Sequence, residues 1–182
     1  MSFVIYEKSG RVVTITLNRP ESRNAIATLQ DCQDLAGALW KANDDPAVNA
    51  VIITGAGKAF CAGGDLKTIR ERTGIGPRQQ PDETRANYRR GVHTIIKALA
   101  EIEVATIAAI NGHAIGLGLD IGVLCDLRIA AASAKMASSF VKVGIIPGDG
   151  GAWILTNAIG ATRAAELVLT GDTIDAEEAL RI

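Results

Sequence analysis

Two segments of this chain share one design, in which a short apolar strand runs into a glycine-rich turn that opens a helix. The first covers residues 50–65 and ends in KAFCAGGD, and the second covers residues 106–120 and ends in NGHAIGLGLD. The first amides of a helix lack partners inside it and carry the positive end of its dipole, while glycine lets a ligand approach the backbone. One such loop taken alone is more often an ordinary turn. A pair of them indicates a site for a developing negative charge.

Strands and helices alternate along the chain, which predicts an α/β fold with a partly parallel sheet. The apolar or alternating runs predict strands at residues 3–7, 11–17, 50–54, 105–110 and 127–131. Helical spacing predicts helices from residue 29 to the stop at Asp44, at 65–71, at 84–102, from the second glycine-rich turn to 124, at 152–158 and at 162–169. Residues 73–82 hold two Gly, two Pro and two Gln, and we expect a mobile loop beside a site there.

Composition and charge exclude several classes of partner. The 19 basic and 20 acidic residues are interspersed and give a net charge of −1, so neither nucleic acid nor an anionic membrane is an expected partner. The N-terminal residues alternate apolar and polar types, unlike a signal peptide, and no run is long and apolar enough to span a bilayer, so we expect a cytoplasmic protein. The three cysteines form no CxxC pair, so we expect reduced, buried thiols and no structural zinc site.

The glycine-rich turns do not match the known phosphate-binding motifs. Gly57-Lys58 is followed by Ala59, where a P-loop needs Ser or Thr. Gly55 and Gly57 are followed by Phe60, where a dinucleotide-binding fingerprint needs its third glycine. The sequence therefore indicates neither a nucleotide cofactor nor a metal site.

Four segments together resemble a known family. Residues 18–26 (NRPESRNAI), 57–69, 108–130 and 143–151 (VGIIPGDGG) are similar, in order and spacing, to the signature segments of the crotonase (enoyl-CoA hydratase/isomerase) superfamily. The resemblance implies one crotonase-like domain over residues 1–182, built as a spiral of ββα units and assembled as a homotrimer or a dimer of trimers. The chain stops at Ile182, inside a predicted helix, so we expect it to be a fragment that lacks the C-terminal helices of the family.

The same resemblance assigns site residues. The backbone amides of Gly64 and Leu117 would form an oxyanion hole for an acyl-CoA thioester, whose carbonyl accepts such bonds most strongly once it becomes an enolate. Coenzyme A would enter as part of the substrate, with no further cofactor. The residues expected to line it are Arg23, Ala25, Ala62, Gly63, Asp65 and Leu66.

Acid and base groups are where the sequence departs from the family pattern. Hydratases of this family use two glutamates; Asp120 takes the first position, on the helix face that carries Leu117, and Phe140 takes the second. Phenylalanine transfers no proton, and Asp149 in the PGDGG turn is the best substitute. Asp120 is also explained as a first-turn aspartate, and Asp149 as a helix cap. His93 and His113 have no partner visible in the sequence, and we interpret both as structural or surface residues.

The sequence thus predicts an enoyl-CoA hydratase or isomerase that works through an enolate held by two amides. Two alternatives stay open. Asp149 without a second glutamate is also compatible with a β-diketone hydrolase that cleaves a carbon–carbon bond by a retro-Claisen reaction. Phe140 and the abrupt end of the chain are also compatible with a non-catalytic acyl-CoA-binding homologue.

Overall fold

A hairpin opens the chain and supplies one edge of the main sheet. The computed structural model describes residues 2–182, and in it β1 (Val4–Ser9) pairs antiparallel with β2 (Val12–Leu17) around a turn in which Gly10 has a φ of 58°. Alternate residues of β2, from Val13 to Leu17, are fully buried. The hairpin predicted from the alternating pattern is confirmed.

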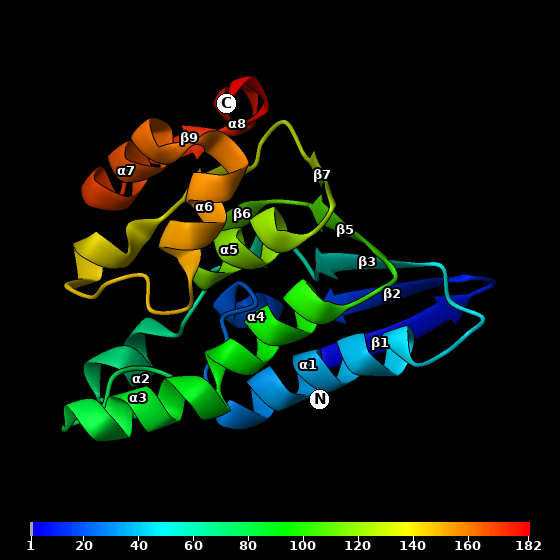
Figure 1. Cartoon of the computed structure of the whole chain (residues 1–182), viewed down its shortest axis with the longest axis horizontal. Helices are drawn as coiled ribbons and strands as arrows, with labels where there is room; N and C mark the ends of the chain where they lie inside the picture. Colours follow the sequence, from blue (N-terminus) through cyan, green and yellow to red (C-terminus); the bar gives the residue numbers. More distant parts are fainter. Residues whose placement is uncertain (1) are drawn as a thin grey trace.

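The main sheet has five strands in the order β1-β2-β3-β5-β7. The strands β3 (Ala50–Gly55), β5 (Ala105–Ile110) and β7 (Leu127–Ala130) follow β2 in parallel. Two helices, α1 (Leu29–Asn43) and α4 (Val92–Glu101), pack against each other across one face of this sheet (Figure 1). Their buried residues, Leu35, Leu39 and Ile95 among them, join the sheet in one hydrophobic core.

A second sheet, which the sequence did not reveal, has four strands of three residues each. Its order is β4 (Ala59–Cys61), β6 (His113–Ile115), β8 (Lys135–Ala137) and β9 (Thr173–Asp175). Three times along the chain a strand of the first sheet is followed by a strand of the second and then by a helical segment, as in β3-β4-α2, β5-β6-α5 and β7-β8-η2. This repeat is the expected spiral of ββα units.

The other helical segments of residues 2–182 are two short 3₁₀ segments and six α-helices. The short 3₁₀ segments are η1 (Pro20–Ser22) and η2 (Ser139–Val143). The α-helices are α2 (Leu66–Arg70), α3 (Pro81–Arg90), α5 (Leu117–Leu124), α6 (Gly151–Ile159), α7 (Ala161–Thr170) and α8 (Ala176–Arg181). Figure 1 shows α6 and α7 above α5, at the C-terminal end of the chain.

One predicted helix is wrong in its extent. Residues 84–102 form parts of two helices, α3 and α4, that are separated at Gly91, whose φ of −108° and ψ of −109° are not helical. A Cβ at Gly91 would lie 2.9 Å from the Cδ2 atom of Leu29, so the close approach of α1 accompanies the break. Helix α3 also begins earlier than predicted, with Pro81 at its first position, so the irregular loop ends at residue 80.

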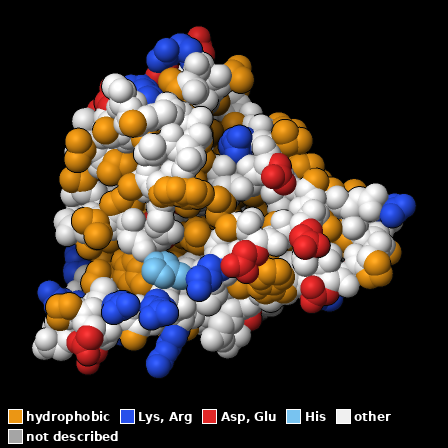
Figure 2. Space-filling view, viewed as in Figure 1, with side chains coloured by type: hydrophobic (Ala, Val, Ile, Leu, Met, Phe, Trp, Pro, Cys, Tyr) orange, Lys and Arg blue, Asp and Glu red, His pale blue; other side chains and the backbone are white. Residues whose placement is uncertain are grey.

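Hydrophobic, basic and acidic side chains are interspersed on the face drawn in Figure 2. Within residues 2–182, no helix is both long and apolar enough to cross a bilayer. Lys and Arg side chains gather over α3 on the face drawn in Figure 2, and Arg85, Arg89 and Arg90 of this helix are exposed. Cys32, Cys61 and Cys125 are free and buried, as expected.

Candidate active site

The first glycine-rich loop is held against the segment that follows η1. The Ala62 amide donates to the Arg23 carbonyl (3.0 Å), the Ile26 amide donates to the Gly63 carbonyl (2.8 Å), and the Asp65 amide donates to the Ile26 carbonyl (3.0 Å). Two of these bonds use the groups that flank Gly64, the Gly63 carbonyl and the Asp65 amide. Within residues 2–182, the Gly64 amide itself donates to no other residue.

Asn24 fixes this arrangement from inside the protein, a role that sequence reasoning missed. It is fully buried with a φ of 58°, a left-handed conformation that asparagine tolerates better than most residues. Its Nδ2 atom donates to the carbonyls of Ala56 (2.9 Å), Ala59 (2.8 Å) and Phe60 (3.2 Å). Asn24 therefore ties the N-terminal loop to the turn after β3 and to the start of β4. The left-handed positions at Arg23 and Asn24 were not readable from the residue types alone.

The second glycine-rich loop meets the first at close range. Gly116 has a φ of 53°, its amide donates to the Ala137 carbonyl (2.8 Å), and α5 begins at the next residue, Leu117. A Cβ at Gly63, which has a φ of 81°, would lie 2.5 Å from the Ile115 carbonyl oxygen and 3.3 Å from the Leu117 nitrogen. The two loops therefore fit together only because residue 63 is glycine.

Both predicted oxyanion donors lie on one cavity. Gly64 and Leu117 line it, together with Ala62, Gly63, Leu66 and Gly116 from the same two loops. The rest of the wall is largely apolar and includes Ile69, Ile75, Val92, Val143 and Ile145. Leu117 is the first residue of a helix, so its amide has no partner inside the helix and is available to a ligand, as is the Gly64 amide. Ile75 brings the irregular loop predicted beside the site onto the cavity wall.

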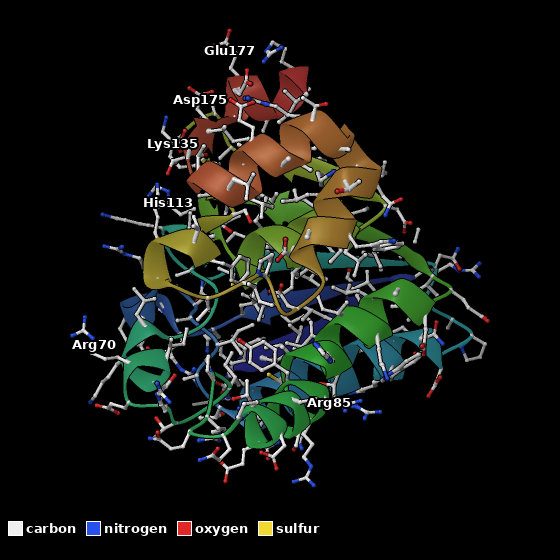
Figure 3. All side chains as sticks on the ribbon, turned by 60° about the vertical axis from the view of Figure 1, so that its left-hand side comes forward. Arg70, Arg85, His113, Lys135, Asp175 and Glu177 are labelled. Atoms are coloured by element: carbon white, nitrogen blue, oxygen red, sulfur yellow. The ribbon has the colours of Figure 1, made fainter. Side chains whose placement is uncertain are left out.

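Three residues expected to contact coenzyme A do not line this cavity. Arg23 is exposed at the surface, Ala25 is buried with its carbonyl accepting a bond from the Arg19 side chain (3.0 Å), and Asp65 caps α2 by accepting from the Thr68 amide (2.9 Å). All three residues lie beside the cavity, because hydrogen bonds join residues 23–26 to the glycine-rich loop 62–65. Arg70, at the end of α2, points away from the molecule (Figure 3).

The two candidate carboxyl groups are neighbours, but only Asp149 lines the cavity. Asp149 is 4% exposed, and Asp120 is fully buried, outside the lining. Neither carboxyl oxygen of Asp120 has a hydrogen-bond partner among the described residues. A Cβ at Gly151 would lie only 2.4 Å from the Oδ2 atom of Asp120, so the start of α6 closes over this carboxyl group.

Burial raises the pKa of both carboxyl groups. Desolvation, followed by the negative charge of Asp149, raises the pKa of Asp120 well above its ordinary value. Desolvation also raises the pKa of Asp149, although the Asp120 carboxyl group and the Gly151 amide (3.3 Å) oppose the rise. The two groups titrate as one unit, and Asp120 is the member that holds its proton to higher pH. The arrangement leaves Asp149 as an ionisable group on the cavity wall.

Phe140 also lines the cavity, at the position where the family resemblance places a second glutamate. Its ring lies against Gly116, with Cζ 3.5 Å from where a Cβ of Gly116 would stand. The wall beside the Leu117 amide is therefore apolar. The Phe140 side chain itself offers neither a hydrogen bond nor a proton to this side of the site.

The two histidines differ in environment. His113 is exposed on β6 and points away from the molecule (Figure 3). The Nε2 atom of His93, in contrast, lies 2.7 Å from the carbonyl oxygen of Gly148, the residue before Asp149. Fifty-five residues separate His93 from this partner, so no local sequence pattern reveals the contact.

The described residues offer no metal site. Over residues 2–182, no three His, Cys, Asp or Glu side chains gather closely enough to hold a metal ion. The described site thus offers main-chain donors, an apolar wall and a pair of buried carboxyl groups.

The comparisons with known proteins agree with this geometry. Residues 7–182 match the family model described as enoyl-CoA hydratase/isomerase. A probable enoyl-CoA hydratase of Mycobacterium bovis is 39% identical over 98% of this chain and 65% of its own length, and a short-chain-enoyl-CoA hydratase of Clostridium acetobutylicum is 38% identical over 98% and 66%. The crystal structure of an enoyl-CoA hydratase from Bacillus anthracis superimposes with a TM-score of 0.88 at 35% identity, covering 99% of this chain and 67% of that one.

These relatives are longer than the chain, which spans about two thirds of their length. The match nevertheless includes both glycine-rich loops, the Asn24 segment and the PGDGG turn. The chain belongs to the enoyl-CoA hydratase/isomerase family, the crotonase superfamily.

Proposed function

We propose that the chain carries the active site of an enzyme that hydrates an enoyl-CoA thioester. The observation that carries the proposal is the meeting of the Gly64 and Leu117 amides at one cavity that Asp149 also lines. Its relatives support the substrate class, since two of them are named short-chain-enoyl-CoA hydratase and crotonyl-CoA hydratase. Coenzyme A would come with the substrate, so the reaction needs no separate cofactor.

In this proposal the thioester carbonyl accepts hydrogen bonds from both amides. Asp149 takes a proton from a water molecule as the water oxygen bonds to the β-carbon, and the electrons of the carbon–carbon double bond move to the carbonyl oxygen. The enolate then collapses, and its α-carbon takes the proton from Asp149. Two amide donors that strengthen as charge develops lower the barrier selectively, by roughly 2.7–4 kcal/mol per donor in a comparable site.

Asp120 has a different proposed role from the one that its sequence position suggested. It lies behind Asp149 rather than on the wall, so we propose that it acts through Asp149. By keeping its own proton, Asp120 allows Asp149 to stay ionised without a second negative charge beside it. Asp149 then combines the roles of base and acid that the two glutamates divide in typical hydratases.

Residues 23–25 and 62–66 are proposed to hold coenzyme A. The hydrogen bonds between these segments support this placement, because they set residues 23–25 beside residues that line the cavity. Arg23 is exposed and is therefore available to a phosphate group, and Leu66 is 62% exposed although it lines the cavity. Calorimetric titration with a coenzyme A ester tests this part directly.

The assembly and location are also part of the proposal. We propose a homotrimer or a dimer of trimers, which the exposed Leu127 (62%) and Ile129 (69%) on the edge strand β7 support as apolar surface for a partner copy. Sedimentation velocity tests it. Three free thiols are common in a reducing compartment and support a cytoplasmic location.

The principal test is turnover of crotonyl-CoA, followed by the loss of enoyl absorbance. Asp149→Asn should lower kcat about 100- to 10,000-fold, the usual range for a lost acid–base group. The exposed Asp172→Asn is a matched control and should leave kcat unchanged. Binding of a coenzyme A ester without turnover at several chain lengths would instead favour a non-catalytic homologue.

A second candidate function is hydrolysis of a β-diketone, and the residues on the cavity wall favour it as well. Phe140 removes the second acid from the wall while Asp149 stays on it, which also suits hydrolysis of a β-diketone by a retro-Claisen reaction. Cleavage of a cyclic diketone without coenzyme A, abolished by Asp149→Asn, would establish this reaction. The wild-type chain should be assayed with both substrates in parallel.

A further inference from the structure

His93 joins helix α4 to the turn that carries Asp149. Its ring is half-buried in the first turn of α4, and its Nε2 atom lies 2.7 Å from the Gly148 carbonyl oxygen. A carbonyl oxygen only accepts hydrogen bonds, so Nε2 must carry the proton and donate it. The bond links two elements 55 residues apart in the chain.

Gly148 also contacts a second aromatic ring. A Cβ at this position would lie 2.7 Å from Cε1 of Tyr88, so the Tyr88 ring packs directly on the backbone of the turn. The Tyr88 and His93 rings meet edge to face, with centroids 6.0 Å apart and an interplanar angle of 74°. The backbone at Gly148 thus has two contacts with the α3–α4 region, a ring packed against it and a hydrogen-bond donor.

The peptide group between residues 148 and 149 sets the direction in which the Asp149 side chain leaves the backbone. The other bonds of the turn are local: the Gly148 amide donates to the Ile146 carbonyl (2.8 Å), and the Gly151 amide donates to Asp149 Oδ1 (3.3 Å). Gly150, with a φ of 99°, follows immediately and adds little stiffness. His93 therefore supplies the hydrogen bond that ties the turn to the rest of the fold at the residue next to Asp149.

We propose that His93 is a positioning residue that aims the Asp149 carboxyl group into the cavity through the Gly148 carbonyl. The inference rests on the proposed function, in which Asp149 is the group that exchanges protons with substrate and water. His93 itself does not line the cavity and is not a catalytic residue. Loss of its donor leaves the amides of Gly64 and Leu117 in place and frees the turn.

The test compares His93→Leu, which lacks a donor, with His93→Gln, whose amide nitrogen can donate to the same carbonyl. His93→Leu should lower kcat for crotonyl-CoA about 10- to 100-fold, the effect of a small misplacement of a reacting group, with KM changed less than about twofold. His93→Gln should recover most of the loss. His113→Leu changes the other, exposed histidine and should behave as wild type.

A second readout does not depend on turnover. The titration midpoint of the Asp149 carboxyl carbon, followed by ¹³C NMR, should shift in His93→Leu and return toward the wild-type value in His93→Gln. Urea unfolding identifies variants that are not folded, and only folded ones are compared. If wild type hydrates no enoyl-CoA, the proposed function fails and the NMR titration alone decides the role of His93. A folded His93→Leu variant with wild-type titration, or with wild-type kcat in an active enzyme, would overturn the inference.

Discussion

Gly151 packs directly on the carboxyl group of Asp120. A Cβ at residue 151 would stand 2.4 Å from Oδ2, 2.8 Å from Cγ and 2.8 Å from Oδ1 of that group. No real Cβ occupies such a distance, so the first residue of α6 must be glycine for Asp120 to keep its place. The contact joins two elements of the proposed site, because the same glycine donates its amide to Asp149.

Gly151→Ala should therefore destabilise the fold by about 1–3 kcal/mol, the usual cost of adding a methyl group to a filled interior, and should lower kcat as well. Gly37→Ala provides the comparison, since a Cβ there meets nothing within 4 Å in the middle of α1, and should stabilise by about 0.5–1 kcal/mol. Urea unfolding measures both changes. A Gly151→Ala variant as stable as wild type would mean that Asp120 can move away at no cost.

The buried Asp120 carboxyl group should make stability depend on pH. Desolvation and the charge of Asp149 raise its pKa in the folded state, so the folded protein holds this proton more tightly than the unfolded chain does. Stability from this group is complete below its unfolded pKa of about 4 and is lost as the pH rises through the raised folded pKa.

Asp120→Asn removes the titration at nearly constant size. The free energy of unfolding of wild type, minus that of Asp120→Asn, should therefore fall as the pH rises above about 4. Urea unfolding at several values between pH 4 and pH 8 gives the difference directly. A difference that stays flat, or that grows with pH, would contradict the raised pKa.

Sequence patterns predicted the parts of this fold that repeat over five or more residues. The runs at β2, β3 and β5 each bury alternate side chains. The alternation is visible in the residue types of β2, whereas β3 and β5 were recognised as short apolar runs. The strands of the second sheet have three residues each, such as Ala59–Cys61, which is too short for any periodicity. They form because the strands of the first sheet bring their connections together, and this cannot be read from a local window.

The candidate site shows the same limit. The two glycine-rich loops were recognised from the sequence, and their residues Gly64 and Leu117 line one cavity in the structure. Asp120 and Asp149 were each singled out by position, but their contact joins α5 to the turn before α6, and nothing local shows which of them faces the cavity. His93 had no visible signal, because its partner is a main-chain carbonyl.

Arg19 and Asp31 hold the N-terminal loop on which the first glycine-rich loop rests. The guanidinium donates to both carboxylate oxygens of Asp31 (2.9 and 2.8 Å), and the amides of Ala27 (2.9 Å) and Thr28 (3.0 Å) donate to Oδ2. Burial alone would raise the pKa of Asp31, but these bonds and the positive charge of Arg19 outweigh it and lower the pKa below its ordinary value.

Asp31→Asn should cost about 1.5–3 kcal/mol of stability near neutral pH, because charged hydrogen bonds are lost at a mostly buried position. The lowered pKa means that this contribution is present above the unfolded pKa of about 4 and disappears as the pH falls through the folded pKa. The gap between wild type and variant should thus close in acid. Asp34 lies on the same helix, and among residues 2–182 its side chain bonds Gln30 alone, so Asp34→Asn should show a much smaller effect at every pH.

A methyl group added at Gly63 tests directly whether the spacing of the Gly64 and Leu117 amides matters to the proposed reaction. A Cβ there would press on the Ile115 carbonyl oxygen at 2.5 Å and on the Leu117 nitrogen at 3.3 Å, and the φ of 81° strains any other residue. Gly63→Ala must therefore part the two loops, and kcat should fall about 100- to 1000-fold, as when one oxyanion donor is removed. At Gly64 the added methyl group would meet the ends of two flexible side chains, Cδ1 of Ile69 at 3.1 Å and Cδ1 of Ile75 at 3.7 Å. Gly64→Ala should therefore keep kcat within about tenfold of wild type, because both amides remain. Steady-state kinetics on crotonyl-CoA and urea unfolding separate catalysis from stability. A folded Gly63→Ala variant with undiminished kcat would show that the spacing of the two amides does not matter to the reaction.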